Sequence, residues 1–102
     1  MICIAEGYAT GATIYAATGY AVAVAFNAGN LGPVVGVIRE NHPDARLIVC
    51  ADDDAGTEGN PGLTHARDAA RATSALVAVP AFGADRPAGA TDFNDLHRAL
   101  RP

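Results

Sequence analysis

Acidic residues follow directly on two apolar runs of this sequence. Asp52, Asp53 and Asp54 come after residues 47–51, and Glu6 comes after residues 2–5. Two unit charges about 4 Å apart repel by about 1 kcal/mol in water and about 4 kcal/mol at an effective dielectric near 20. A bound cation would remove this cost. Carboxylate oxygens are hard ligands, so the acids indicate Mg²⁺ or Mn²⁺ rather than zinc.

Each acidic group also has a simpler interpretation. Glu6 could be an isolated charge at a strand end, and the three aspartates from Asp52 to Asp54 could form a solvated turn, where aspartate is common. Asp92 and Asp95 lie in the C-terminal segment. There they could serve only to stabilise the start of a helix, whose dipole favours negative charge.

Four apolar segments predict strands, and four segments between or after them predict helices. We expect strands at residues 2–6, 21–26, 47–51 and 75–79, and helices at about 8–18, 32–41, 61–73 and 91–100. Residues 47–51 lack the alternation of a half-exposed strand, so both faces of this strand should be covered. The alternation of strands and helices predicts a three-layer α/β domain, with a mainly parallel four-stranded sheet built from four βα units.

Local signals support several of these boundaries. Gly19 is a suitable residue after the end of the first helix. Asn60 is a good N-cap and Pro61 a good first helical residue for the third helix. Residues 81–90 contain two glycines and a proline and are predicted to form a loop.

The strand order decides whether the acids meet. In an open parallel sheet, ligands bind at the carboxyl ends of the strands, where the strand order reverses. If the order is 2-1-3-4, that point lies between the first and third strands. Glu6 and the aspartates from Asp52 to Asp54 would then face each other across one crevice.

The composition excludes several kinds of chemistry. The 102 residues suit one small domain, with a net charge of −4, and all seven basic residues are arginine. Without lysine, the chain cannot build a Walker A phosphate loop or a Schiff base by itself. An acidic domain is also a poor clamp for nucleic acid, so metal ions or other domains would have to supply positive charge.

The sequence contains no segment that predicts membrane insertion or export. No run reaches about 18 apolar residues, and the N-terminal apolar run meets Glu6 too soon for a signal peptide. We therefore expect a cytoplasmic location and no membrane partner. Cys3 and Cys50 fall in predicted strands and are expected to be buried free thiols.

Three motifs together resemble the Toprim domain. They are Glu6-Gly7, Asp52-x-Asp54 followed by glycine, and Asp92-Phe93-Asn94-Asp95. This domain occurs in bacterial-type DNA primases, topoisomerases of types IA and II, and some nucleases. The chain is most similar to the Toprim segment of plasmid- and phage-type primases and primase-helicases, and the resemblance covers nearly the whole chain.

The resemblance implies a Rossmann-like fold and a role for each acid. Glu6 would be the general acid or base, Asp52 and Asp54 would hold Mg²⁺ or Mn²⁺, and Asp92 and Asp95 match further acidic positions near the metal. Two departures affect the metal site. Gly56 follows Asp54 after one residue rather than the usual two, which leaves open whether Asp53 binds metal. Thr10 stands where cellular primases carry an aspartate.

The resemblance further implies the nucleotidyl-transfer core of a DNA primase, which makes RNA primers for plasmid, phage or mobile-element replication. We expect residues 1–102 to be a single Toprim domain from a larger primase, inactive without its flanking domains. The expected partners are nucleotides, a single-stranded DNA template bound through additional domains, and a replication helicase domain or protein. A Toprim-type metal-dependent nuclease and a non-catalytic remnant acting as an interaction module remain alternatives.

Overall fold

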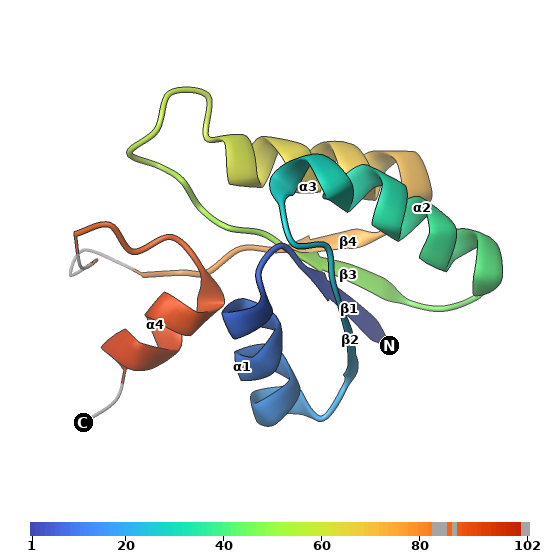
Figure 1. Cartoon of the computed structure of the whole chain (residues 1–102), viewed down its shortest axis with the longest axis horizontal. Helices are drawn as coiled ribbons and strands as arrows, with labels where there is room; N and C mark the ends of the chain where they lie inside the picture. The colour runs from blue at the N-terminus through green and yellow to red at the C-terminus, as the bar shows by residue number, and fades with distance from the viewer. Residues whose placement is uncertain (83–85, 87, 101–102) are drawn as a thin grey trace.

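The computed structural model describes residues 1–82, 86 and 88–100, and it confirms the α/β fold class (Figure 1). Four parallel strands form one sheet in the order β2-β1-β3-β4, so the order considered from the sequence is correct. The strands are β1 (Ile2–Ala5), β2 (Ala21–Val24), β3 (Leu47–Cys50) and β4 (Leu76–Ala78). The main helices are α1 (Tyr8–Thr18), α2 (Leu31–Asn41), α3 (Pro61–Thr73) and α4 (Phe93–Ala99).

The register of the sheet brings the ends of the central strands level. Ala5, the last residue of β1, pairs with Val24 of β2 and with Cys50 of β3. The chain therefore leaves β1 and β3 at the same edge of the sheet. The acids that follow these two strands begin from neighbouring positions, which is the first requirement for a shared site.

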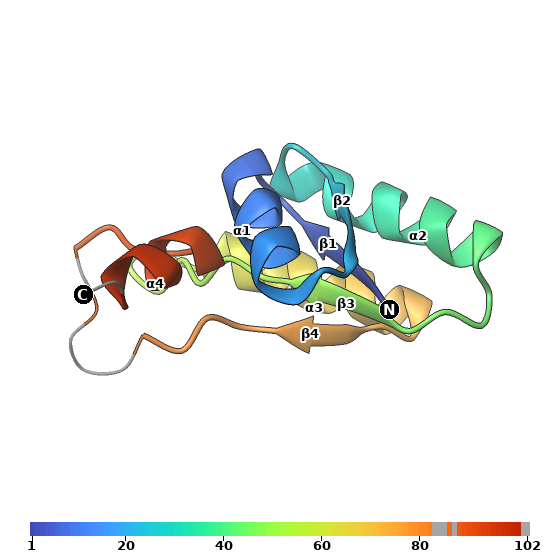
Figure 2. The same cartoon turned by 90° about the horizontal axis from the view of Figure 1, so that it is seen from below.

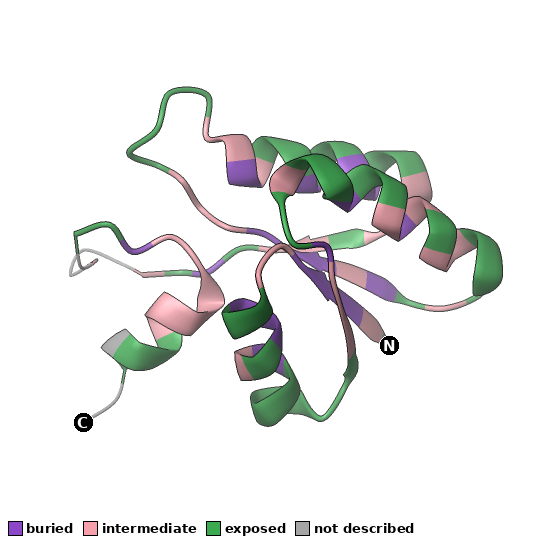
Figure 3. Ribbon diagram, viewed as in Figure 1, coloured by how far each residue is buried: buried purple, intermediate pink, exposed green. Residues whose placement is uncertain are grey.

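Helices cover both faces of the sheet (Figures 1 and 2). The face under α2 and α3 holds the larger core, which includes Ile4, Val35, Leu47 and Val49, all at most 1% exposed. Alanines dominate the buried stripe of α3, and their small side chains let this helix pack closely on the sheet. The face under α1 and α4 holds a smaller cluster around Ile14. Figure 3 shows the buried residues gathered along the strands and on the inner sides of the helices.

Several predicted boundaries need correction. The strand predicted to reach residue 26 ends at Val24, and a short 3-10 helix (Ala28–Asn30) lies before α2. Here the Asn27 side chain accepts a hydrogen bond from the Asn30 amide, which stabilises the tight turn. The helix predicted from residue 91 begins at Phe93. Of the loop predicted at 81–90, residues 83–85 and 87 lie outside the described residues.

Arg39 near the end of α2 joins three segments of backbone. Its Nε donates to the Thr73 carbonyl at 2.8 Å, and a terminal nitrogen donates to the Ala45 carbonyl at 2.7 Å. Further hydrogen bonds reach the carbonyls of Pro43 and Ser74 at 3.1 and 3.3 Å. One guanidinium thus ties the end of α3 to the turn that leads into β3. The planar fork with several donors makes this possible, and a single ammonium group could not reproduce it.

Replacing Arg39 by alanine is expected to lower the free energy of unfolding by about 2–3 kcal/mol, because hydrogen bonds from a charged donor contribute about 1.5–3 kcal/mol. Arg39→Lys should recover less than half of the loss. Urea denaturation followed by circular dichroism measures both changes. Arg46→Ala is the matched control, since Arg46 is exposed and should shift stability by no more than about 0.5 kcal/mol. Equal effects at the two positions would contradict the assignment.

None of the helices in the described ranges is long and apolar enough to cross a membrane.

Candidate metal centre

Glu6 and the aspartates from Asp52 to Asp54 follow the ends of β1 and β3, and we call this side of the sheet the acidic edge. Asp52 lies at its centre. It follows buried Ala51, whose amide donates to the Ala78 carbonyl of β4 at 2.8 Å, so the chain stays extended just past β3. The Oδ1 atom of Asp52 is buried and has no hydrogen-bond partner among the described residues. Burial of a carboxylate oxygen without a donor is costly, since water is lost and nothing replaces it.

The pKa of Asp52 reflects the acids that lie around it. Its pKa is raised to about 8, first by burial, then by the hydrogen bond that its protonated form can give to Glu6, and then by the negative charges of Glu6, Asp92 and Asp54. Like charges this close disfavour the ionised form. The acids that follow β1 and β3 therefore lie near one another, as the sheet topology predicts, and Asp92 at the start of α4 lies close enough to add to their charge.

Asp54 is held against the start of α3. Its Oδ2 accepts a hydrogen bond from the Gly62 amide at 2.8 Å. Its own amide donates to Oδ1 of Asn60 at 2.7 Å. The fit is close at Gly62, where a Cβ atom would lie 2.7 Å from Asp54 Oδ2 and 2.9 Å from the Asp52 carbonyl oxygen. Only glycine lets the helix approach the acidic loop in this way.

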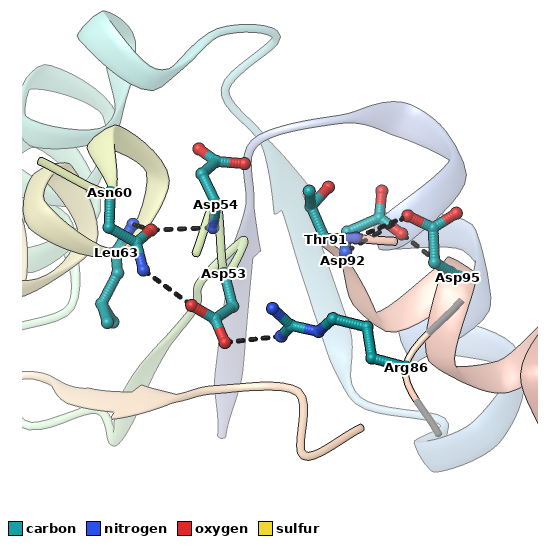
Figure 4. A network of polar contacts seen from close by, with 8 residues as sticks. All are labelled: Asp53, Asp54, Asn60, Leu63, Arg86, Thr91, Asp92 and Asp95. Atoms are coloured by element: carbon teal, nitrogen blue, oxygen red, sulfur yellow. Dashed lines mark hydrogen bonds and ion pairs between the residues drawn. The ribbon is translucent and has the colours of Figure 1, made fainter. Parts of the chain in front are cut away.

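The side chain of Asp53 points away from that of Asp54, and both of its oxygens accept hydrogen bonds (Figure 4). Asn60 Nδ2 donates to its Oδ1 at 2.7 Å, and Arg86 donates to its Oδ2 at 2.6 Å. These two interactions lower the pKa of Asp53, the Asn60 hydrogen bond being the larger cause. The Asp53 amide also donates to the Thr91 carbonyl at 2.6 Å.

Asp92 and Asp95 form a capping box at the start of α4 (Figure 4). Asp92 is the N-cap residue and accepts from the Asp95 amide at 2.8 Å, while Asp95 accepts from the Asp92 and Thr91 amides at 3.4 and 2.9 Å. Their hydrogen bonds are therefore those of the simpler interpretation, in which the two aspartates stabilise the start of a helix. Asp92 also adds to the negative charge around Asp52.

The donor set at this edge fits a hard divalent cation. The donor groups are carboxylates, and Oδ1 of Asp52, which has no hydrogen-bond partner among the described residues, is available to a cation. Within the described residues, no three histidine, cysteine or acidic side chains already stand at metal-binding distance. Asp54 and Asp92 accept hydrogen bonds from backbone amides, so their side chains would have to rotate to complete a coordination sphere.

Three residues of this edge were not identified from the sequence. Asn60 was predicted as an N-cap, and it is one, but its side chain also orders Asp53 and Asp54. A signal for Gly62 was present, because a glycine in the first turn of a helix after a proline suggests a close approach. Arg86 carried no signal, since its partner Asp53 is far away in the sequence.

A separate apolar groove of about 340 Å³ lies between α1, α4 and the sheet, and it contains none of these acids. Cys3 and Cys50 line it as buried free thiols, as predicted. Burial, followed by the neighbouring Cys3, raises the pKa of Cys50 to about 12. These thiols are therefore packing residues and not nucleophiles.

Comparisons with known proteins agree with the fold. A family model for the Toprim domain matches residues 1–101. A DNA primase TraC from Escherichia coli is 40% identical over 85 residues, which are 79% of this chain and 8% of that protein. A second DNA primase TraC from Escherichia coli is 38% identical over 99 residues, 93% of this chain and 7% of that protein. No solved structure gives a significant match.

The family model covers nearly the whole chain, and the parallel sheet with acids at the ends of β1 and β3 is the architecture expected for it. The chain belongs to the Toprim family. It is homologous to part of DNA primase TraC from Escherichia coli, and it spans less than a tenth of the length of these relatives.

Proposed function

We propose that this chain is the Mg²⁺- or Mn²⁺-dependent nucleotidyl-transfer core of a DNA primase. The single observation that carries the proposal is the state of Asp52, whose buried Oδ1 lacks a partner while Glu6, Asp54 and Asp92 surround it with negative charge. A domain that only supports other domains gains nothing from this arrangement, because it destabilises the fold. The similarity to DNA primases TraC supports the choice of reaction.

Each acid has a distinct task in this proposal. Asp52, Asp54 and Asp92 would hold the divalent cation, which when bound supplies positive charge to the phosphates and lowers the pKa of the attacking hydroxyl. Glu6 follows β1 and lies within reach of Asp52, so its carboxylate can accept the proton of the attacking 3′-hydroxyl. Asn60 and Gly62 keep the loop from Asp52 to Asp54 in place against α3.

The proposed partners include further domains that supply the positive charge that this domain lacks. Its net charge is −4, so a template strand would have to be bound by other domains, in keeping with the small share of the TraC relatives that it covers. Nucleoside triphosphates would be the substrates at the acidic edge, and a replication helicase domain or protein would be a further partner. The chain alone should therefore bind metal and make no primers.

Metal binding is the first test of this proposal. Calorimetry with Mn²⁺ should show binding by this chain, and Asp52→Asn/Asp54→Asn should weaken it at least tenfold because two ligands lose their charge. The matched control Glu58→Gln/Asp68→Asn removes the same charge from exposed positions and should leave the affinity within about twofold. Absence of binding by the parent chain would favour a non-catalytic interaction module.

We expect primer synthesis to require further domains, so activity is tested in a chimaera in which this chain replaces the matched segment of an Escherichia coli TraC primase. We expect template-dependent primer synthesis that Glu6→Gln reduces at least 100-fold, since proton transfer contributes about 10²–10⁴ to the rate. Mn²⁺ affinity should change little in Glu6→Gln. Strand cleavage without primer synthesis would support the nuclease alternative instead.

A further inference from the structure

Asp53 has a different environment from the two aspartates that flank it. Asp52 has an unpartnered buried oxygen, and Asp54 uses one oxygen on the Gly62 amide. By contrast, both oxygens of Asp53 are hydrogen-bonded, to Asn60 and to Arg86. A carboxylate already satisfied by a guanidinium and an amide has little left to give a metal, and binding one would require breaking the ion pair with Arg86.

The contacts of Asp53 reach the segment that carries Asp92. Its side chain holds Arg86 at 2.6 Å, and its amide donates to the carbonyl of Thr91, the residue just before Asp92, also at 2.6 Å. Arg86 is steadied on its other side by Phe82, with the guanidinium carbon 4.5 Å from the ring centre. Asp53 thus contacts the segment between β4 and α4 at two points, of which Figure 4 shows the ion pair with Arg86.

We propose that Asp53 is a positioning residue, which with Arg86 forms a clamp that holds Asp92 beside Asp52, and that Asp53 does not bind the metal. The proposal rests on the metal-dependent function proposed above. The reason for the clamp is that Asp92 lies at the start of α4, in a different segment from the loop that carries Asp52.

The capping partners of Asp92 lie within α4 itself. Phe93 packs against the apolar cluster of the sheet, and Asn94 accepts a hydrogen bond from Thr13 of α1, so these contacts place the apolar side of α4. The Asp53 clamp adds the polar connection between the loop after β3 and the segment that leads into Asp92.

Arginine substitutions separate this proposal from direct metal binding by Asp53. Removing a positive charge near a cation site should by itself strengthen cation binding, since repulsion is lost. If Asp53 were a ligand, Arg86→Gln would free it and raise the affinity for Mn²⁺. If Asp53 and Arg86 form a clamp, Arg86→Gln lowers the affinity, because Asp92 is no longer held in place. The two interpretations predict opposite signs.

Arg67→Gln is the matched control. Arg67 is exposed on α3 and contributes positive charge near Asp53, but it makes no hydrogen bond to Asp53 among the described residues. We expect Arg86→Gln to weaken Mn²⁺ binding about tenfold, the lower end of the range for residues that orient metal ligands. Arg67→Gln should leave binding unchanged or strengthen it up to about threefold. Arg86→Lys, which keeps the charge, should recover part of the loss.

Hydrogen exchange measured without metal provides an independent measurement of the clamp and shows whether the variants remain folded. In Arg86→Gln the amide of Asp53 should exchange at least tenfold faster, while amides of β1 and β3 keep their protection. Unchanged or tighter Mn²⁺ binding by Arg86→Gln overturns the inference and leaves the proposed function standing. If the parent chain binds no Mn²⁺, the proposed function fails first, and the inference fails with it.

Discussion

Gly62→Ala is expected to lower the free energy of unfolding by about 2–4 kcal/mol. The added Cβ would lie 2.8 Å from Asp52 Cβ and 2.9 Å from the Asp52 carbonyl oxygen, and backbone cannot turn aside as a flexible side chain can. Overpacking of this kind costs about 1–3 kcal/mol, and displacing Asp54 from the Gly62 amide adds the loss of a hydrogen bond to a charged acceptor. Chemical denaturation measures the change.

Gly36→Ala provides the control for this substitution. Gly36 lies inside α2, and a Cβ atom there would meet nothing within 4 Å. Alanine should therefore stabilise the helix by about 0.5–1 kcal/mol. The two glycine substitutions should thus have opposite signs, and Gly62→Ala should also weaken Mn²⁺ binding. A Gly62→Ala protein as stable as the parent would contradict the close approach of α3 to the acidic loop.

Asp52→Asn is expected to stabilise the metal-free protein while weakening metal binding. The pKa of Asp52 is raised from 3.8 to about 8 in the folded state, so the folded protein holds a proton that the unfolded chain has lost. Stability from this group is therefore complete below about pH 3.8 and declines as the pH rises to about 8. The gain on removing the charge should reach about 1–3 kcal/mol above pH 8, with allowance for the partial solvent exposure of Asp52.

Denaturation in the presence of a chelator at pH 5, 7 and 9 measures this pH dependence. The advantage of Asp52→Asn should grow with pH, while the exposed substitution Asp68→Asn should stay within about 0.5 kcal/mol of the parent throughout. Saturating Mg²⁺ should stabilise the parent more than the variant, because stabilisation by a ligand grows with its affinity for the folded state. An Asp52→Asn protein that is less stable than the parent at pH 9 would show that the negative charges around Asp52 do not destabilise the folded protein.

Local patterns in the sequence were enough to predict the fold. Strands were recognised from apolar runs, and helix ends from Gly19, Asn60 and Pro61, because these residues act through their own backbone or through the adjacent turn. The strand order 2-1-3-4 entered only as a condition, and the structure shows that this condition holds. The convergence of Glu6 and Asp52 was predictable under the same condition.

The details of the site depend on contacts that no local pattern encodes. Arg86 and Asp53 meet across 33 positions of sequence. The three adjacent aspartates look equivalent in the sequence, yet one lacks a partner, one is held by an amide and one joins an arginine. These differences arise when separate segments pack, so the sequence could not tell which aspartates were available to a metal.

The order of the strands has a consequence for how the protein is made. β1 lies inside the sheet and pairs with β3 through Ile2 and Leu47, so the N-terminal strand stays half unpaired until the middle of the chain has been synthesised. Such distant pairings slow folding. The acidic edge takes Glu6 from the start of the chain, Asp52 from its middle and Asp92 from near its end. Glu6 and Asp52 therefore meet only when β3 pairs with β1, so the repulsion between these two acids arises together with the central strands of the sheet.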